Sequence, residues 1–102
     1  MPIKDGLEQI EGIIRSLKHS QREERLSLHG TILTILSQID KVEQENPVPN
    51  YKIYKNDLLT SVEFLCELDG GDPQEGEHIG RSLLAVRKMA SYSCFNVNHH
   101  YI

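Results

Sequence analysis

The chain contains no tryptophan, six other aromatic residues and two cysteines. With so few aromatic side chains, its core must be built from leucine, isoleucine and valine, which suits helix packing better than a β-sandwich. Two cysteines are too few for a disulfide framework. We therefore expect an all-α protein with reduced thiols, in the cytoplasm.

Long apolar runs are also missing. No stretch approaches the roughly 18 to 20 residues that a membrane-spanning helix requires. Residues 1–6 (MPIKDG) lack the apolar segment of a secretory signal. These absences lead us to expect neither a membrane partner nor export.

Apolar residues recur at helical spacing, four and three residues apart, in three segments. They are Leu7, Ile10, Ile14 and Leu17; Leu28, Ile32, Ile35, Ile39 and Val42; and Ile79, Leu83, Val86 and Ala90. This spacing places them on one side of each helix. A chain of 102 residues is long enough for one domain. The sequence predicts a single antiparallel helical bundle over residues 1–102.

Cap and turn signals predict helices at about residues 6–19, 21–45, 56–69 and 73–92, a proline loop at 46–50 and an irregular tail at 93–102. The signals are capping boxes at residues 5–8 and 20–23, Asn56 before the third helix, and Asp72, Pro73 and Glu75 before the fourth.

The number of helices depends on residues 13–29, where no glycine, proline, asparagine or aspartate forces a turn. If residues 6–44 formed one long helix, the bundle would have three helices. Gln21 and Glu24 interrupt the apolar positions there, which favours a break near His19 and Ser20. Gly30, inside the second predicted helix, is expected to allow close approach of a neighbouring helix.

Charge is segregated along the chain, whose net charge is −4. Residues 1–36 balance, residues 37–77 carry ten acids and three bases, and residues 78–102 carry three bases and no acid. This layout disfavours nucleic acid as a partner of the whole domain and favours attraction between segments, within one chain or between two.

Two groups of residues are candidates for binding a partner. A basic stripe steps at helical spacing and suits an acidic partner or a phosphate backbone, although a solvated face is the simpler interpretation. The tail is apolar, whereas a disordered segment is usually polar. We therefore expect it to dock on its own bundle or on a second subunit, or else to engage an external partner. The residues concerned are Arg15, Lys18, Arg22 and Arg25 in the stripe, and Phe95, Tyr101 and Ile102 in the tail.

Other combinations suggest chemistry only weakly. Glu75 and His78 have the spacing of one metal-ligand pair in di-iron bundles, which need two such pairs. Cys94, His99 and His100 supply three of the four ligands of a structural zinc site. We therefore expect no metal, cofactor or catalytic residue.

Arg22 and His29 have a spacing similar to that of the arginine–histidine pair of HEPN ribonucleases, which are small helical bundles. The resemblance covers these two residues alone. It would imply an arginine that holds a phosphate and a histidine that acts on the ribose hydroxyl.

The function most consistent with these patterns is a small acidic protein–protein interaction module that forms a homodimer or covers a partner's surface. Bacterial regulators, antitoxins, immunity proteins and secretion chaperones share this size and class, which is an analogy of fold alone. The alternatives are a small helical enzyme, metal-dependent or ribonuclease-like, and a nucleic-acid-binding regulator that uses the stripe from Arg15 to Arg25.

Overall fold

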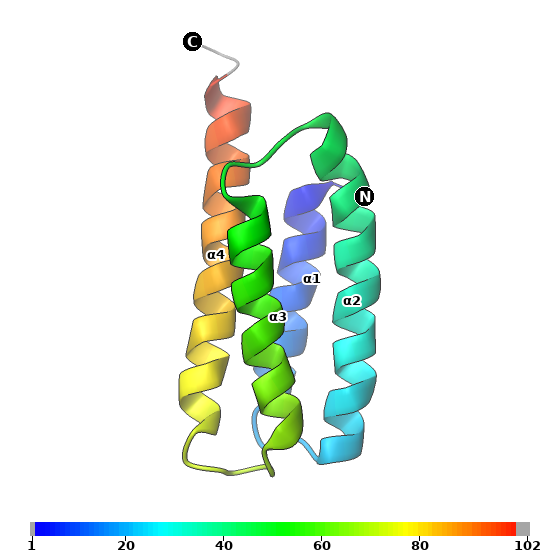
Figure 1. Ribbon diagram of the computed structural model, residues 1–102, viewed down its shortest axis with the longest axis vertical. Coiled ribbons are helices and arrows are strands. Elements are labelled where there is room, and N and C mark those ends of the chain that lie inside the picture. Colours follow the sequence, from blue (N-terminus) through cyan, green and yellow to red (C-terminus); the bar gives the residue numbers. More distant parts are fainter. Residues whose placement is uncertain (1, 100–102) are drawn as a thin grey trace.

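The computed structural model describes residues 2–99, and side chains through Tyr92. The chain forms four α-helices: α1 (Ile3–Ser16), α2 (Arg22–Glu45), α3 (Tyr51–Glu67) and α4 (Glu75–His99). Successive helices run in opposite directions, so the α1–α2 and α3–α4 loops lie together at one end of the bundle (Figure 1). The described part of the chain contains no strand, which confirms the predicted all-α antiparallel bundle.

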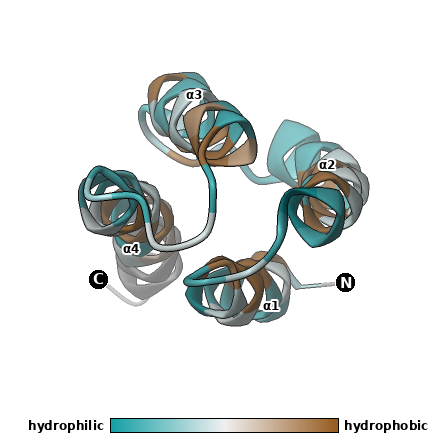
Figure 2. Ribbon diagram, turned by 90° about the horizontal axis from the view of Figure 1, so that it is seen from below, coloured by the Kyte–Doolittle hydropathy of each residue, from teal (hydrophilic) through white to brown (hydrophobic). Residues whose placement is uncertain are grey.

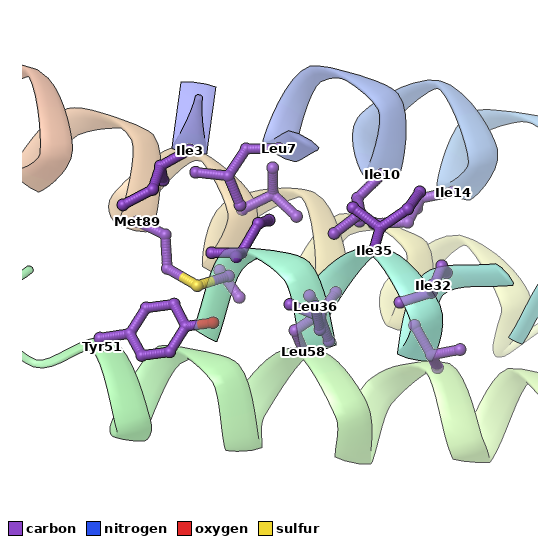
Figure 3. Close-up of a cluster of buried hydrophobic side chains, with 14 of the residues drawn as sticks. Ile3, Leu7, Ile10, Ile14, Ile32, Ile35, Leu36, Tyr51, Leu58 and Met89 are labelled. Atoms are coloured by element: carbon purple, nitrogen blue, oxygen red, sulfur yellow. The ribbon is translucent and has the colours of Figure 1, made fainter. Parts of the chain in front are cut away.

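Viewed along its length, the bundle places the helices at the corners of a square, with apolar segments turned inward (Figure 2). The expected apolar positions fill this interior. Leu7, Ile10 and Ile14 of α1, with Ile32 and Ile39 of α2, are at most 1% exposed. From the other side, α3 and α4 contribute Leu58, Val62, Val86 and Met89. Figure 3 labels Leu58 and Met89 among them. Apart from Tyr51, Ala85 and Met89, this core is built of leucine, isoleucine and valine, as the composition predicted.

The break between α1 and α2 falls where the polar residues predicted it. After Leu17 the backbone of His19 turns to a φ of +62°, in the left-handed region that ends many helices. The bundle therefore has four helices, and the alternative of one helix over residues 6–44 is wrong.

Two predicted helix starts and one predicted cap are wrong. α1 begins at Ile3, so Asp5 lies in its first turn and is no cap. The N-cap of α2 is Gln21, while the hydroxyl of Ser20 donates a hydrogen bond to Leu17 O (2.6 Å). α3 begins at Tyr51, which places Asn56 inside the helix. Caps are local signals, and burial of Ile3 and Tyr51 extends two of these helices beyond them.

The C-terminal boundary and Gly30 also differ from expectation. α4 continues to His99, so the segment expected to be irregular from residue 93 is helical that far. Residues 100–102 lie outside the described residues. Gly30 is exposed, and a Cβ added there would meet nothing within 4 Å. It is therefore not a point of close helix approach.

A small polar cluster joins α2 to the start of α3. The Tyr51 hydroxyl donates to Asp40 Oδ1 (2.5 Å), and Lys55 Nζ donates to Asp40 Oδ2 (2.7 Å). Burial and the hydrogen bond to Asp40 raise the pKa of Tyr51 far above its ordinary value. Tyr51 thus remains a neutral donor and fixes this hairpin.

Within the described residues, no helix combines the length and apolar character needed to cross a lipid bilayer.

Candidate functional site

Arg25 lies at the loop end of the bundle with its side chain fully buried. Nε donates to Ser20 Oγ (3.1 Å), and one terminal nitrogen donates to the backbone oxygens of Leu65 (2.7 Å) and Leu68 (3.1 Å). The other terminal nitrogen donates to Leu17 O (3.1 Å) and to the carboxylate of Glu75. These five bonds match the five N–H donors of a guanidinium. Arg25 therefore caps the carboxyl ends of α1 and α3 together.

Glu75, 3% exposed, completes this network from the start of α4. Its carboxylate accepts backbone hydrogen bonds from His19 N (3.1 Å) and Gly71 N (3.3 Å), besides the ion pair with Arg25. Burial alone would raise the pKa of Glu75, but the hydrogen bonds from His19, Arg25 and Gly71 outweigh it and hold the pKa below its ordinary value. The carboxylate stays ionised and ties the two loops together.

This network corrects the predicted basic stripe. The stripe required a continuous helix, and the break at residues 17–21 divides it between α1 and α2. Arg25 is buried and cannot reach a partner. Arg22, half-exposed, donates to Glu67 O (2.9 Å) and lies 3.5 Å from Asp69. Arg15 and Lys18 remain exposed, with Arg15 3.4 Å from Glu11. The stripe is not one surface.

The apolar tail residues cannot be placed in the same way. Phe95 belongs to α4, but its side chain lies outside the described side chains. Tyr101 and Ile102 lie outside the described residues.

The pairs with weak chemical signals have structural contacts. Glu75 binds Arg25, while His78 stacks on Phe64 with ring centroids 5.1 Å apart. Cys66 is half-buried, its thiol contacts Arg25 O (3.7 Å), and burial raises the pKa of the thiol. A raised pKa makes it a weaker nucleophile at neutral pH.

Arg22 and His29 make no common interaction in the described contacts. Arg22 binds the end of α3, and the buried Nε2 of His29 has no hydrogen-bond partner among the described residues. Cys94, His99 and His100 lie beyond the described side chains.

A second feature is the outer surface shared by α3 and α4, which we call the α3–α4 face. It consists of exposed residues at helical spacing on both helices. They are Ile53, Asp57, Thr60 and Phe64 on α3, and Glu77, Arg81, Leu84 and Lys88 on α4. The two helices lie side by side in both views (Figures 1 and 2). Three of these residues are large and apolar, and they are half-exposed: Ile53 by 59%, Phe64 by 49% and Leu84 by 52%.

A groove of about 240 Å³ runs along the centre of this face. Its lining includes Leu84 and Ala85, with Arg81, Lys88 and Asp57 as the charged groups. Aromatic contacts lie at either end of the groove. The stack of Phe64 on His78 lies at one end, and at the other Lys88 Nζ lies 5.5 Å from the ring centre of Tyr54.

The other exposed large apolar residues among the described side chains are Leu26 and Leu33, both on α2. The α3–α4 face is thus the one described surface with large exposed apolar side chains on both helices. A sequence signal for it exists, since Phe64 and Leu84 lie outside the core spacing of their own helices.

Comparison of the chain with known protein families, with curated proteins and with solved structures finds no match. The assignment of function therefore rests on the surface and contacts described above.

Proposed function

We propose that this protein is a protein–protein interaction module that binds a helical surface of its partner through the α3–α4 face. The observation that carries the proposal is the exposure of Ile53, Phe64 and Leu84 on the neighbouring helices α3 and α4. Adjacent exposed apolar side chains with a polar border are typical of protein interaction sites.

The energetics of this face favour docking. Complete burial of a leucine, isoleucine or phenylalanine side chain contributes about 1.5 to 3 kcal/mol. Ile53, Phe64 and Leu84 are already half-buried, so each would add about 1 kcal/mol on contact. The groove beside Leu84 would accept side chains of the partner, and the charges around it would orient that partner.

The spacing on the face defines the partner's form. Apolar residues on antiparallel helices are complemented by a helix or helix pair with its own apolar stripe at positions i, i+3 or i+4, and i+7. Because Arg81 forms an ion pair with Glu77 (2.7 Å) and lines the groove with Asp57 and Lys88, the partner surface should carry both signs of charge.

A photo-crosslinking experiment tests the use of this face. The cross-linking amino acid p-benzoylphenylalanine is placed at Leu84, and for comparison at Gln9, an exposed residue of α1 on another side of the bundle. In cells that produce the protein, we expect a discrete adduct from position 84 and none from position 9. Phe64→Ser, a change outside the core, should abolish the adduct. Adducts from both positions, or an adduct unaffected by Phe64→Ser, would contradict the proposal.

Two alternative functions, the metal-dependent enzyme and the nucleic-acid binder, each depended on a residue that has a structural contact instead. The metal-dependent enzyme relied on Glu75, which binds Arg25, and the nucleic-acid binder relied on a stripe of which Arg25 is a buried member.

A further inference from the structure

We infer that two copies of this chain bind each other antiparallel through the outer surface shared by α2 and α3, which we call the α2–α3 face. Because α2 and α4 lie on either side of α3 (Figure 2), this face is separate from the α3–α4 face, which the dimer leaves free. The basis is the placement of opposite charges at equal distances from the centre of the α2–α3 face.

The centre of this face is apolar. Leu26 is 58% exposed and Leu33 is 44% exposed. Leu26 follows Arg22 by one helical turn, and Leu33 precedes Asp40 by two turns. Because Arg22 and Asp40 both form hydrogen bonds with α3, the two leucines lie on the side of α2 that borders α3.

A contact between α2 and α3 fixes their relative height. The Cys66 thiol lies 3.7 Å from Arg25 O, and the helices are antiparallel, so each step forward along α2 corresponds to a step back along α3. Seven residues from this contact, residue 32 of α2 is level with Leu59 of α3. Leu59 lies two turns from Cys66 and is partly buried, so it borders α2 next to Leu33.

Four charged residues surround this apolar centre. On α2, Glu23 and Lys41 are 18 residues or five turns apart, so they lie on one side of the helix with residue 32 midway. On α3, Lys52 and Glu67 are 15 residues apart, with their midpoint between residues 59 and 60. Both midpoints therefore fall at the level of Leu59. Within the described side chains, none of the four forms an ion pair.

Each end of the face carries charge of one sign. Lys41 and Lys52 lie at the end with the α2–α3 loop, and Glu23 and Glu67 lie at the other end. A twofold axis across the face at the level of Leu59 brings Lys41 of each chain to Glu23 of the other, and Lys52 to Glu67. The partners lie at equal distances from the axis, about 13 Å on α2 and about 11 Å on α3, so both pairs form in one register.

The remaining charges of the face fit the same register. Arg22 pairs with Asp69 in its own chain (3.5 Å), and Asp40 pairs with Lys55 (2.7 Å). Glu63 and Lys55 each lie four residues from residue 59, on opposite sides of it. The axis therefore places Glu63 of each chain opposite Lys55 of the other.

One acid at a like level lies outside the face. Glu24 is level with Asp40 of the other copy. Arg25, between Glu24 and Leu26 in the sequence, points into the core, so Glu24 and Leu26 lie on opposite flanks of α2. Glu24 is thus turned towards α1 and away from the second copy.

The charges also select the direction of the second copy. In a parallel pair, α2 of one chain would face α3 of the other at equal height. Lys41 would then lie beside Lys52, and Glu23 beside Glu67, which are two repulsive contacts on each side. The antiparallel arrangement replaces all of them with attractive contacts.

The face is large enough for a stable dimer. The 24 residues of α2 make it about 36 Å long, and the bundle is 22 × 19 Å across. A face of about 36 × 20 Å is close to the roughly 800 Å² that each partner buries in a stable interface.

A charge-reversal experiment tests the contact of Glu23 with Lys41. Glu23→Lys alone gives two lysines at each contact, and Lys41→Glu alone gives two glutamates. Each variant should weaken the homodimer about tenfold or more, because both contacts change from attraction to repulsion. A mixture of the two variants should form a heterodimer about as tight as the original dimer, because both contacts are attractive again. Sedimentation equilibrium measures the mass, which for the dimer is twice the 11.7 kDa of the chain.

The matched control is Glu8→Lys, the same charge reversal at an exposed residue of α1, outside the face. It should leave the dimer dissociation constant unchanged. Circular dichroism of every variant confirms that the helices are intact. Equal weakening by Glu8→Lys, or no recovery in the mixture, would overturn the pairing of Glu23 with Lys41.

Disulfide trapping tests the position of the axis. In a background of Cys66→Ser and Cys94→Ser, Leu33→Cys should oxidise to a covalent dimer, because a residue near a twofold axis meets its own copy. Glu23→Cys and Lys41→Cys should each remain monomeric under the same conditions and cross-link when mixed. Cross-linking of Glu23→Cys with itself and none of Leu33→Cys would overturn the antiparallel arrangement.

Failure of this inference can be told from failure of the proposed function, because the two use different faces. A folded chain with monomer mass from about 1 µM to about 1 mM would overturn the dimer. A discrete, Phe64-dependent adduct from position 84 in that monomer would leave the interaction through the α3–α4 face standing. A dimer that Glu23→Lys weakens, with no adduct from position 84, would support the inference and contradict the proposed function alone.

Discussion

Arg25 illustrates how a charged side chain is accommodated in the core of a small bundle. A buried guanidinium is costly to desolvate, but here every donor has an acceptor and the charge has a carboxylate partner. Three of the acceptors are carbonyls at the carboxyl ends of α1 and α3, of which Leu17 O and Leu65 O also accept backbone hydrogen bonds from Ser20 and Leu68. One side chain thus caps the carboxyl ends of two helices.

Removal of one member of this network should be far more harmful than removal of an exposed charge. Arg25→Met leaves Glu75 ionised and buried without its cation and removes the Arg25 donor from Leu68 O, and we expect a loss of about 3 to 5 kcal/mol in the free energy of unfolding. Arg15→Met, at the exposed pair with Glu11, should cost less than about 0.5 kcal/mol. Urea denaturation followed by circular dichroism measures both. A loss below about 1 kcal/mol for Arg25→Met would contradict this account of the network.

Glu75 should make the stability of the bundle sensitive to acid. Its pKa is lower in the folded chain than in the unfolded chain, so its contribution is present above the unfolded pKa of about 4.3 and is lost as pH falls through the lower folded value. Glu75→Gln removes the ionisation while keeping an acceptor. The difference in unfolding free energy between the original chain and this variant should therefore shrink from about pH 6 to about pH 3. A difference that stays constant over this range would show that Glu75 does not titrate as described.

At the scale of the elements, Gly70 lies in a close contact between two loops, whereas Gly30 lies on open surface. A Cβ at Gly70, in the α3–α4 loop, would lie 2.8 Å from Ser20 O and 3.1 Å from His19 O, which are backbone atoms of the other loop. Gly30 in α2 has open space around it. The two loops therefore leave no room for a side chain at Gly70, while the middle of α2 has room for one at Gly30.

These surroundings predict opposite effects for the same substitution. Gly70→Ala should lower the free energy of unfolding by about 1 to 3 kcal/mol, because backbone must move. Gly30→Ala should raise it by about 0.5 to 1 kcal/mol, because alanine is the better helix former. Thermal and urea unfolding of the two variants, side by side, measures the difference. An equal effect of both substitutions would mean that the loops are not in close contact.

The sequence predicted helices where apolar residues repeat over several turns, because that pattern reports burial directly. It located the break near Ser20 from Gln21 and Glu24. It did not predict the burial of Arg25, because hydrogen-bond acceptors from three separate segments meet there only in the folded chain. Helix starts were missed for a similar reason, since packing of Ile3 and Tyr51 outweighs a nearby cap signal.

At the scale of the whole molecule, the buried charges and the exposed apolar surface lie in different regions of the bundle. The loop end is fixed internally by Arg25 and Glu75, whereas the α3–α4 face leaves Phe64 and Leu84 exposed within a bundle of 47 × 22 × 19 Å. A surface of this length can supply the roughly 800 Å² per partner that a stable interface buries. Small bundles gain from such contacts, because their own cores bury a modest share of the chain.

Coupling between association and stability gives the last prediction. If two copies bind through the α2–α3 face, association stabilises the folded chain by mass action, and the midpoint of thermal unfolding should rise by a few degrees for each tenfold increase in concentration. Leu33→Ser removes the central contact and should abolish this dependence while changing the midpoint of the dilute chain little, since the residue is half-exposed there. Leu84→Ser, at a comparably exposed leucine of α4, is the matched control and should keep the concentration dependence. Scanning calorimetry of the three chains over the same concentrations measures it. A midpoint independent of concentration in the original chain, or a dependence lost in Leu84→Ser and kept in Leu33→Ser, would place the dimer contact elsewhere or exclude it.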